Sequence, residues 1–439
     1  MTVQRYIQGD TSVNIARSVE AAVAHGHLSA GDHLPPVRTL AGSLRVSPAT
    51  VASAYRLLQD RGVIIADGRR GTRIRHGSAV AGPAPVALPS GVRDLAAGNP
   101  DPALLPDLAT AIRRAPITAK LYSDDLNDAR LLEVARNQFE GDRIPSKHLA
   151  VVSGALDGIE RVLREHLRAG DRVAVEDPCF TGILDLLSAM SLVSVPVPVD
   201  DEGLLPAKLQ KAIRSVQALV LTPRAQNPTG AAMSTRRVRQ LRAIVAVRPE
   251  LLIMEDDHAG PIAGAPYLTL ADASREHWAV VRSVSKSLGP DLRLALLAGD
   301  RGTVARVEGR QTLGIRWVSH LLQTLVATLW TDRNVQKRLA RAERAYAERR
   351  QLLIATLEQR GIEAHGSSGL NVWIPVPEES AVVQTLFQKQ WAVNAGERYR
   401  IATPPAIRVT ISTMTRDEIL SFANDLASIL RPPQRRTFA

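Results

Sequence analysis

Residues 34–74 read LPPVRTLAGSLRVSPATVASAYRLLQDRGVIIADGRRGTRI. Apolar residues recur at helical spacing over residues 37–44 and again over 51–58, which predicts two short amphipathic helices. Only residues 45–46 separate them, and Ser47 supplies a side-chain cap for the second helix. This arrangement is typical of a helix-turn-helix.

Two β-rich runs complete the same unit. Residues 63–65 and 72–74 flank the sequence DGRRG at 67–71, which predicts a hairpin with a basic tip, a wing. An earlier apolar stripe over residues 15–23 predicts one more helix. Residues 1–76 carry ten arginines against five acidic residues, which is the charge that a DNA-binding module needs.

This unit resembles the GntR-type winged helix-turn-helix over its whole length. The resemblance rests on the Leu-Pro-x-x-Arg entry at 34–38, the Val-Ser-x-x-Thr-Val turn at 46–51 and the Arg-Gly-Thr wing at 70–72. It implies that these side chains contact DNA phosphates or bases: Arg38, Ser47, Thr50, Arg56, Arg69 and Arg70.

One position of the turn departs from the family pattern. Pro48 stands where many members carry a polar or basic residue, so base recognition rests more on Ala49, Thr50 and Ser53, or is weak. The alternative is a winged helix that serves only protein contacts.

The composition sets the class of protein. With 439 residues, 45% hydrophobic and 23% charged, the chain has room for a small module and a large α/β domain. No apolar run approaches the ~18 residues of a membrane span, and the start MTVQRYIQGD lacks the apolar core of a signal peptide. Cys179 is the only cysteine, which favours a reducing cytoplasm. The net charge of +11 favours an acidic partner, nucleic acid first.

The rest of the chain alternates strand and helix patterns. Residues 76–93, rich in Pro, Gly and Ala, form a linker between a DNA-binding domain at 1–75 and an α/β domain at 94–431. The last part of that domain, about 333–431, reads as a smaller α+β subdomain. Strands are predicted at 149–153, 172–176, 194–199, 218–222, 251–255, 279–284, 294–298, 370–374 and 407–411. Such alternation predicts a mostly parallel sheet flanked by helices.

Motifs with chemical potential follow these strands. Lys286 lies among small hydroxyl residues in SVSKSLGPDLR at 283–293, a pattern that is either a solvated loop or a lysine able to form a Schiff base with an aldehyde. Ser153-Gly154-Ala155 opens a helix, which offers backbone N–H groups to a phosphate. Phe180 offers a ring face, Asn227 an amide, and Asp256 a carboxylate at a strand end.

The order and spacing of these motifs resemble fold-type I aminotransferases, which bind pyridoxal 5'-phosphate (PLP), across residues 94–431. Joined to the winged helix, the chain resembles the MocR-type regulators. The resemblance implies Lys286 as the Schiff-base lysine, Asp256 as partner of the pyridine nitrogen, Asn227 as ligand of the phenolic oxygen and Phe180 as the stacking ring. The implied phosphate-side residues are Ser153, Gly154, Ala155, Ser283, Ser285, Arg293 and, from the neighbouring subunit of a homodimer, Tyr122. Arg408 is implied as the clamp for a substrate or effector carboxylate.

Three positions of this domain depart from the family pattern. His258 stands where a tyrosine usually donates to the phenolic oxygen; it takes that role or is an ordinary loop histidine. Asn127 replaces a frequent glycine, and Leu156 replaces a polar residue of the phosphate loop. We expect Cys179 to be a buried filler, and we expect no metal site.

A basic helix face is predicted near the start of the small subdomain. Arg333, Lys337, Arg341 and Arg344 fall on one side of a helix, which is either solvated or a second DNA contact.

These patterns together predict a cytoplasmic, homodimeric, PLP-dependent transcriptional regulator that binds double-stranded DNA and senses an amine, an amino acid or PLP itself. The alternative is an active aminotransferase with an accessory DNA-binding module.

Overall fold

The computed structural model describes residues 3–29, 31–60, 63–66, 71–74 and 88–430. Its N-terminal part contains η1 (Val3–Tyr6), α1 (Ser12–Ala24), β1 (His33–Leu34), α2 (Val37–Leu44), α3 (Pro48–Asp60), β2 (Ile64–Ala66) and β3 (Thr72–Ile74). The strands form an antiparallel sheet in the order β1-β3-β2. The predicted helix-turn-helix and the strands of the wing are therefore confirmed, while the wing tip at 67–70 lies outside the described residues.

The core of this unit comes from the predicted apolar stripes. Ile15 of α1, Leu40 of α2 and Val51 of α3 are fully buried together with Ile74 of β3. Between the last two helices, Arg45 adopts a left-handed conformation (φ 55°) that ends α2 and lets the chain turn into α3. The helices thus meet at a tight turn, as a helix-turn-helix requires.

The large domain is built on one sheet with the strand order β5-β12-β11-β10-β9-β6-β7-β8 in the described part of the chain. Its strands are β5 (Leu149–Val152), β6 (Arg172–Asp177), β7 (Val193–Asp200), β8 (Gly203–Leu204), β9 (Ala218–Leu221), β10 (Leu252–Asp257), β11 (Trp278–Ser283) and β12 (Ala295–Gly299). Strands β6, β9, β10 and β11 run parallel, whereas β12 pairs antiparallel with both of its neighbours. The sheet is mostly parallel, as predicted.

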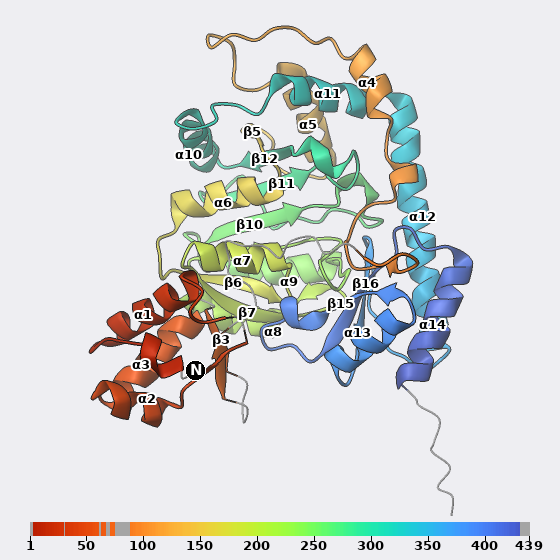
Figure 1. The fold of residues 1–439 in the computed structure, drawn as a ribbon. Coiled ribbons are helices and arrows are strands. Elements are labelled where there is room, and N and C mark those ends of the chain that lie inside the picture. The colour runs from red at the N-terminus through yellow and green to blue at the C-terminus, as the bar shows by residue number, and fades with distance from the viewer. Residues whose placement is uncertain (1–2, 30, 61–62, 67–70, 75–87, 431–439) are drawn as a thin grey trace, which may run out of the picture. The chain divides into compact units, whose positions relative to one another are not determined.

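Helices and short 3-10 turns connect and flank these strands. They are η3 (Pro102–Leu104), α4 (Leu108–Arg114), α5 (Ala129–Gly141), α6 (Ala155–His166), α7 (Thr181–Ala189), α8 (Pro206–Ala212), η4 (Ile213–Ser215), α9 (Thr235–Val245), η5 (Gly260–Ile262), η6 (Pro290–Leu292), α10 (Arg301–Thr312) and α11 (His320–Thr331). Helix α6 crosses the sheet and contacts β5, β10, β11 and β12 (Figure 1). Gly158 permits this close approach, because a Cβ there would lie 2.9 Å from Val152 and 3.1 Å from Val281.

The C-terminal subdomain begins along the 26-residue helix α12 (Arg333–Glu358). Its other elements are β13 (Asn371–Pro375), α13 (Glu379–Gln388), β14 (Trp391–Ala392), β15 (Asn394–Ala395), η7 (Gly396–Arg398), β16 (Ala406–Thr410) and α14 (Arg416–Leu430). A small sheet of order β13-β16-β15 packs with α13, and α14 lies along α12 (Figure 1). The short strand β4 (Arg93–Asp94), far away in sequence, pairs with β14. Among the described helices, none combines the length and apolar character needed to cross a bilayer.

Candidate functional site

The parallel strands bring the predicted site residues to one edge of the large sheet. Phe180 follows β6, Asn227 follows β9, Asp256 lies at the end of β10, and Lys286 follows β11. Because these four strands run in the same direction and are neighbours in the sheet, their carboxyl ends meet. The architecture therefore gathers residues that are separated by more than a hundred positions.

Asp256 is a buried carboxylate with an unused oxygen. The residue is 4% exposed, and its Oδ1 atom has no hydrogen-bond partner among the described residues. Burial, and then the neighbouring charge of Asp257, raise the pKa of Asp256 to about 7. A buried acceptor without a partner is costly. The N–H of a protonated pyridine ring is a donor of the kind that this position lacks.

Lys286 is hydrogen-bonded within the chain. Its Nζ atom donates to the carbonyl oxygen of Gly98 at 2.8 Å. Burial, and then the charge of Arg408, lower the pKa of Lys286 to about 8. A lowered pKa makes the neutral amine, which is the nucleophilic form, more accessible near neutral pH.

A phosphate cradle lies where α6 begins. Gly154 has a φ of 101° and caps the helix N-terminus, so backbone N–H groups of the first turn are open to an anion. A Cβ at Gly154 would lie 3.1 Å from Nη2 of Arg293, which places this guanidinium over the same turn. The hydroxyls of Ser283 and Ser285 lie 3.1 Å apart at the end of β11. These groups fit a phosphate.

The ring of Phe180 is supported from behind by a glycine. A Cβ at Gly182 would lie 2.6 Å from a ring carbon of Phe180, so a larger residue would displace the ring. Phe180 itself is half-buried and can present its other face to a flat ligand. Nothing in the sequence pattern had singled out Gly182.

Arg408, in the central strand β16 of the small sheet, is a buried guanidinium. It is 4% exposed; its Nη1 donates to Oδ1 of Asn227 at 3.2 Å and its Nη2 donates to the carbonyl of Ala96. The ring of Tyr399 lies 5.0 Å from the guanidinium carbon, and Nε has no partner among the described residues. Burial lowers the pKa of Arg408. A buried cation that is hydrogen-bonded to neutral oxygens suits a carboxylate ligand.

The bond that Asn227 makes with Arg408 leaves the amide nitrogen of Asn227 as the group that can donate to a ligand. That orientation agrees with the role implied by the resemblance, and it couples the two predicted site residues directly.

His258 makes a hydrogen bond that limits what it can donate. Its Nε2 lies 2.8 Å from the carbonyl oxygen of Ala225, and since a carbonyl only accepts, Nε2 carries the proton. Burial lowers the pKa of His258 to about 4, so the ring is neutral and Nδ1 can only accept. In this arrangement His258 does not supply the donor that a tyrosine would.

Asn127 has a structural task. Its Nδ2 donates to Glu308 of α10 at 2.7 Å, and its Oδ1 accepts from the backbone N–H of Val151 in β5 at 3.2 Å. The residue therefore ties the loop before α5 to the edge of the sheet.

Tyr122 lies on that same loop, outside the site. It is 80% exposed, and its neighbours are Arg316, which donates to its carbonyl oxygen, and the ring of Trp317 at 5.8 Å. Exposed apolar side chains lie on the two segments that meet here: Leu121 is 68% exposed, and Leu313 and Ile315, on the segment that carries Arg316, are 82% and 53% exposed.

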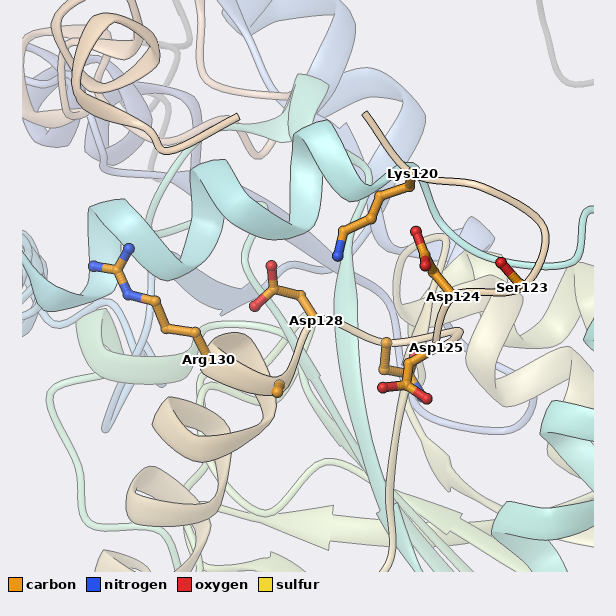
Figure 2. Close-up of a pocket in the computed structure, with 8 residues that line it drawn as sticks. Lys120, Ser123, Asp124, Asp125, Asp128 and Arg130 are labelled. Carbon is orange, nitrogen blue, oxygen red and sulfur yellow. The ribbon is translucent and has the colours of Figure 1, made fainter. Parts of the chain in front are cut away.

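A separate cavity of about 430 Å³ lies at this loop. Its lining residues are Lys120, Ser123, Asp124, Asp125, Asn127, Asp128, Ala129 and Arg130. Figure 2 shows Lys120 among the carboxylates of Asp124, Asp125 and Asp128. The residues that line it do not include any of the predicted cofactor ligands.

In the N-terminal unit, Arg38 and Arg56 are exposed on α2 and α3. Ser47 caps α3: its Oγ accepts from the backbone N–H of Thr50 at 3.1 Å and lies 2.8 Å from the hydroxyl of Thr50. Arg69 and Arg70 lie outside the described residues.

Tyr55 was predicted only as part of an apolar stripe. Its hydroxyl donates to the carbonyl of Pro35 at 2.7 Å, which fixes the entry to α2, and burial raises its pKa above the usual range.

Comparison with known proteins agrees with both units. Residues 11–74 match the family model of bacterial regulatory proteins, gntR family, and residues 91–426 match that of aminotransferase class I and II. The vitamin B6 salvage pathway transcriptional repressor PtsJ of Salmonella typhimurium is 40% identical over 97% of this chain and 99% of its own. The pyridoxine biosynthesis regulator PdxR of Corynebacterium glutamicum is 27% identical over 78% of each chain.

Solved structures show the fold of the large domain. A kynurenine aminotransferase of Pyrococcus horikoshii superposes with a TM-score of 0.70 at 21% identity, covering 78% of this chain and 91% of its own. With the matches to both family models and to a full-length regulator, the chain belongs to the MocR-type transcriptional regulators, in which a GntR-type helix-turn-helix precedes an aminotransferase class I and II domain.

Proposed function

We propose that this transcriptional regulator binds PLP through Lys286 and uses the loading of that site to control DNA binding. The observation that carries the proposal is the orphaned, buried Oδ1 of Asp256 at the same sheet edge as Lys286 and the phosphate cradle. When bound, PLP supplies an aldehyde that combines with amines and a ring that withdraws electrons.

The side chains divide the work of holding the cofactor. Asp256 accepts from the pyridine N–H, Phe180 stacks on the ring, and the amide of Asn227 donates to the phenolic oxygen. Gly154, Ala155, Ser153, Ser283, Ser285 and Arg293 hold the phosphate. Gly154 and Ala155 lie at a helix N-terminus whose N–H groups suit an anion. The hydroxyls of Ser283 and Ser285, which bond each other, and the N–H of Ser153, which donates to Asp157, would exchange those bonds for the phosphate.

The nature of the signal has two candidates. The names of PtsJ and PdxR connect those relatives with vitamin B6, which supports PLP itself as the signal. Arg408 supports an amino acid instead, because its buried guanidinium pairs with neutral oxygens and suits a carboxylate, which free PLP lacks. We propose PLP as the primary signal, with an amino acid as the second candidate. The alternative remains an active aminotransferase, since the residues proposed to hold PLP and a carboxylate are also those that such an enzyme needs.

A homodimer is part of the proposal. The proposed dimer surface consists of four exposed apolar residues, Leu121, Tyr122, Leu313 and Ile315. Arg316 and Trp317 contact Tyr122 and so join the two segments that carry these residues. Burying such a surface against a second copy removes it from water and brings Tyr122 to the neighbouring phosphate. We place the dimer in the cytoplasm, where its DNA target lies.

Contact with DNA is assigned to Arg38, Ser47, Thr50 and Arg56 in the described part of the winged helix, and to Arg69 and Arg70 in its wing. The basic face of α12 formed by Arg333, Lys337, Arg341 and Arg344 is exposed and stays a prediction as a second contact.

The test combines spectroscopy and DNA binding. Addition of PLP to purified protein is expected to give a yellow complex, and borohydride reduction is expected to fix the cofactor on the peptide that contains Lys286. DNA affinity is then compared for unloaded protein, PLP-loaded protein, and loaded protein with a panel of amino acids. A wild type that stays colourless with PLP rejects the cofactor site. Sustained transamination, with DNA binding indifferent to donor and cofactor, rejects the regulatory use of the site in favour of an enzyme.

A further inference from the structure

Residues 93–99, which we call the strap, are the first part of the large domain after the linker. They are held mainly by the C-terminal subdomain. The N–H groups of Arg93 and Leu95 donate to the carbonyls of Gln390 and Ala392, and the N–H of Thr410 donates to the carbonyl of Leu95. The strap is therefore hydrogen-bonded to β14 and β16 and to the residue before β14, all in the C-terminal subdomain.

Further bonds continue this attachment to the end of the strap. Asn394 donates to the carbonyl of Ala96 at 2.6 Å, Arg408 donates to the same carbonyl, and Ser412 donates to the carbonyl of Asn99 at 2.6 Å. All three donors come from the C-terminal subdomain.

One bond has a different origin. The carbonyl of Gly98 accepts from Nζ of Lys286, which follows β11 of the large sheet. Within the described part of the chain, Lys286 is the one hydrogen-bond donor to the strap from outside both the strap and the C-terminal subdomain. Gly98 has a φ of 69°, which favours glycine, and a Cβ there would lie 3.4 Å from Nη2 of Arg408, so the turn that presents this carbonyl is in van der Waals contact with Arg408.

We propose that Lys286 is a clasp as well as a cofactor ligand: in the unloaded protein it fastens the strap to the large sheet, and loading of the site opens this clasp. The inference rests on the proposed function for its trigger. Because the strap lies at the start of the large domain in sequence, opening the clasp changes how the start of that domain is anchored.

The chemistry of loading removes the donor. The Lys286 ammonium would first release one proton to solvent. The neutral nitrogen would then form a C=N bond to the aldehyde carbon of PLP, and the aldehyde oxygen would leave as water with the two hydrogens of the amine. The ammonium that donates to Gly98 would thereby be lost, and no oxidant or reductant is needed. The carbonyl of Gly98 then has to find another donor or turn toward solvent, since an unpaired buried carbonyl is unfavourable.

Hydrogen–deuterium exchange of the strap, read by mass spectrometry on peptides covering residues 88–101, tests the clasp without relying on activity. In cofactor-free protein, Lys286→Ala is expected to speed exchange of the strap amides about tenfold, the lower end of what a charged hydrogen bond contributes. The matched control is Lys286→Arg, which keeps a cationic donor for Gly98 but cannot form the bond to PLP. It is expected to exchange like unloaded wild type. Wild type loaded with PLP, without reduction, is expected to exchange like Lys286→Ala.

Three results overturn the clasp: unchanged exchange in Lys286→Ala, equally fast exchange in Lys286→Arg, or slow exchange in the wild type loaded with PLP. The loaded wild type needs no substitution, so it decides the question even where a variant folds poorly. Failure of the proposed function is seen separately. If PLP leaves the absorbance of the wild type unchanged, the cofactor site is rejected, while the comparison of cofactor-free wild type with Lys286→Ala still decides the clasp.

Discussion

Asp256 and Asp257 are adjacent carboxylates at the end of β10, both buried, and their surroundings are opposite. Asp257 accepts two hydrogen bonds from Arg224 at 3.0 Å and one from Arg282 at 2.6 Å, and these guanidinium groups hold its pKa well below the usual range. Asp256 has an oxygen without a partner, and its pKa is raised to about 7. Alternation along the strand sends the two side chains to opposite faces.

This difference separates two uses of a buried charge. A carboxylate whose partners are within the chain builds the fold, whereas one whose partner is missing marks where a ligand completes the structure. The same distinction applies to Arg282, which is paired with two carboxylates, and Arg408, which is bonded to neutral oxygens.

The largest expected effect is the loss of stability in Asp257→Asn. Removing one member of a buried ion pair leaves uncompensated charge, here on Arg224, since Arg282 keeps its pair with Asp142, and typically costs about 3–5 kcal/mol. Urea unfolding followed by circular dichroism measures it. Asp256→Asn is the matched control, and no loss of stability is expected near pH 7, because no hydrogen bond to Oδ1 is broken and the neutral amide avoids the cost of a buried carboxylate. Equal losses of unfolding free energy in the two variants would show that Asp257 does not stabilise the fold more than Asp256 does.

The second expected effect is a pH dependence carried by Asp256 in cofactor-free protein. Its folded pKa of about 7 lies above the value near 3.9 expected for an unfolded chain, so between these values the folded state binds the extra proton. Stability therefore falls as pH rises through this window and levels off above pH 7. A shift of about three units corresponds to about 4 kcal/mol at most.

Unfolding of wild type and Asp256→Asn at several values between pH 4.5 and 8 measures this effect. Titrating groups that do not interact with Asp256 are common to both proteins and cancel in the difference. Glu176 does not cancel, because the charge of Asp256 contributes, after burial, to raising its pKa to about 8. Wild type is expected to lose stability relative to the variant as pH rises. Parallel profiles would show that Asp256 is not the isolated carboxylate described above.

A third, smaller effect concerns Arg408. Losing a charge-assisted contact to a carboxylate costs about 1.5–3 kcal/mol, so Arg408→Ala is expected to weaken the DNA-binding response to an amino acid about ten- to a hundredfold. Titration of loaded protein with amino acids, read by DNA affinity, measures it. Arg408→Lys keeps the charge but lacks the planar guanidinium group. Its DNA-binding response to an amino acid is expected to lie between those of wild type and Arg408→Ala. A response to PLP alone that survives in Arg408→Ala identifies the cofactor as the signal.

The smallest effect extends the comparison to the winged helix. Arg38 is exposed, whereas the buried hydroxyl of Tyr55 donates a hydrogen bond to the carbonyl oxygen of Pro35. Arg38→Ala is expected to weaken DNA binding at all sequences and to reduce the slope of log affinity against log salt by about one. Tyr55→Phe is expected to cost about 1–3 kcal/mol of stability with the salt slope unchanged. A salt slope that is unaffected in Arg38→Ala removes this residue from the phosphate contacts.

Much of the fold could be predicted because its signals are local. The strand Thr72–Ile74 was predicted with its observed bounds, and the other predicted strands differ by one or two residues at their ends. The pairing of β4 with β14 was not predicted, since its partners are some three hundred residues apart and each is only two residues long.

The candidate site likewise contains residues that local sequence patterns predict and contacts that they do not predict. Lys286, Asp256 and Asn227 stand out because each follows a strand in a recognisable order. Their partners do not: the carbonyl of Gly98, the support of Phe180 by Gly182 and the bond from His258 to Ala225 depend on backbone positions that three-dimensional packing alone determines.

Under the proposed function, the bond between Lys286 and Gly98 also bears on how much PLP is needed to load the site. In the unloaded chain an internal group already occupies the amine, so an incoming aldehyde has a competitor built into the protein. The apparent dissociation constant then exceeds the intrinsic one by the reciprocal of the fraction of molecules in which that amine is free. Substitutions that tighten or loosen residues 93–99 without touching the ligand are thereby able to shift the cellular concentration at which the regulator switches, so its sensitivity can be tuned separately from its specificity.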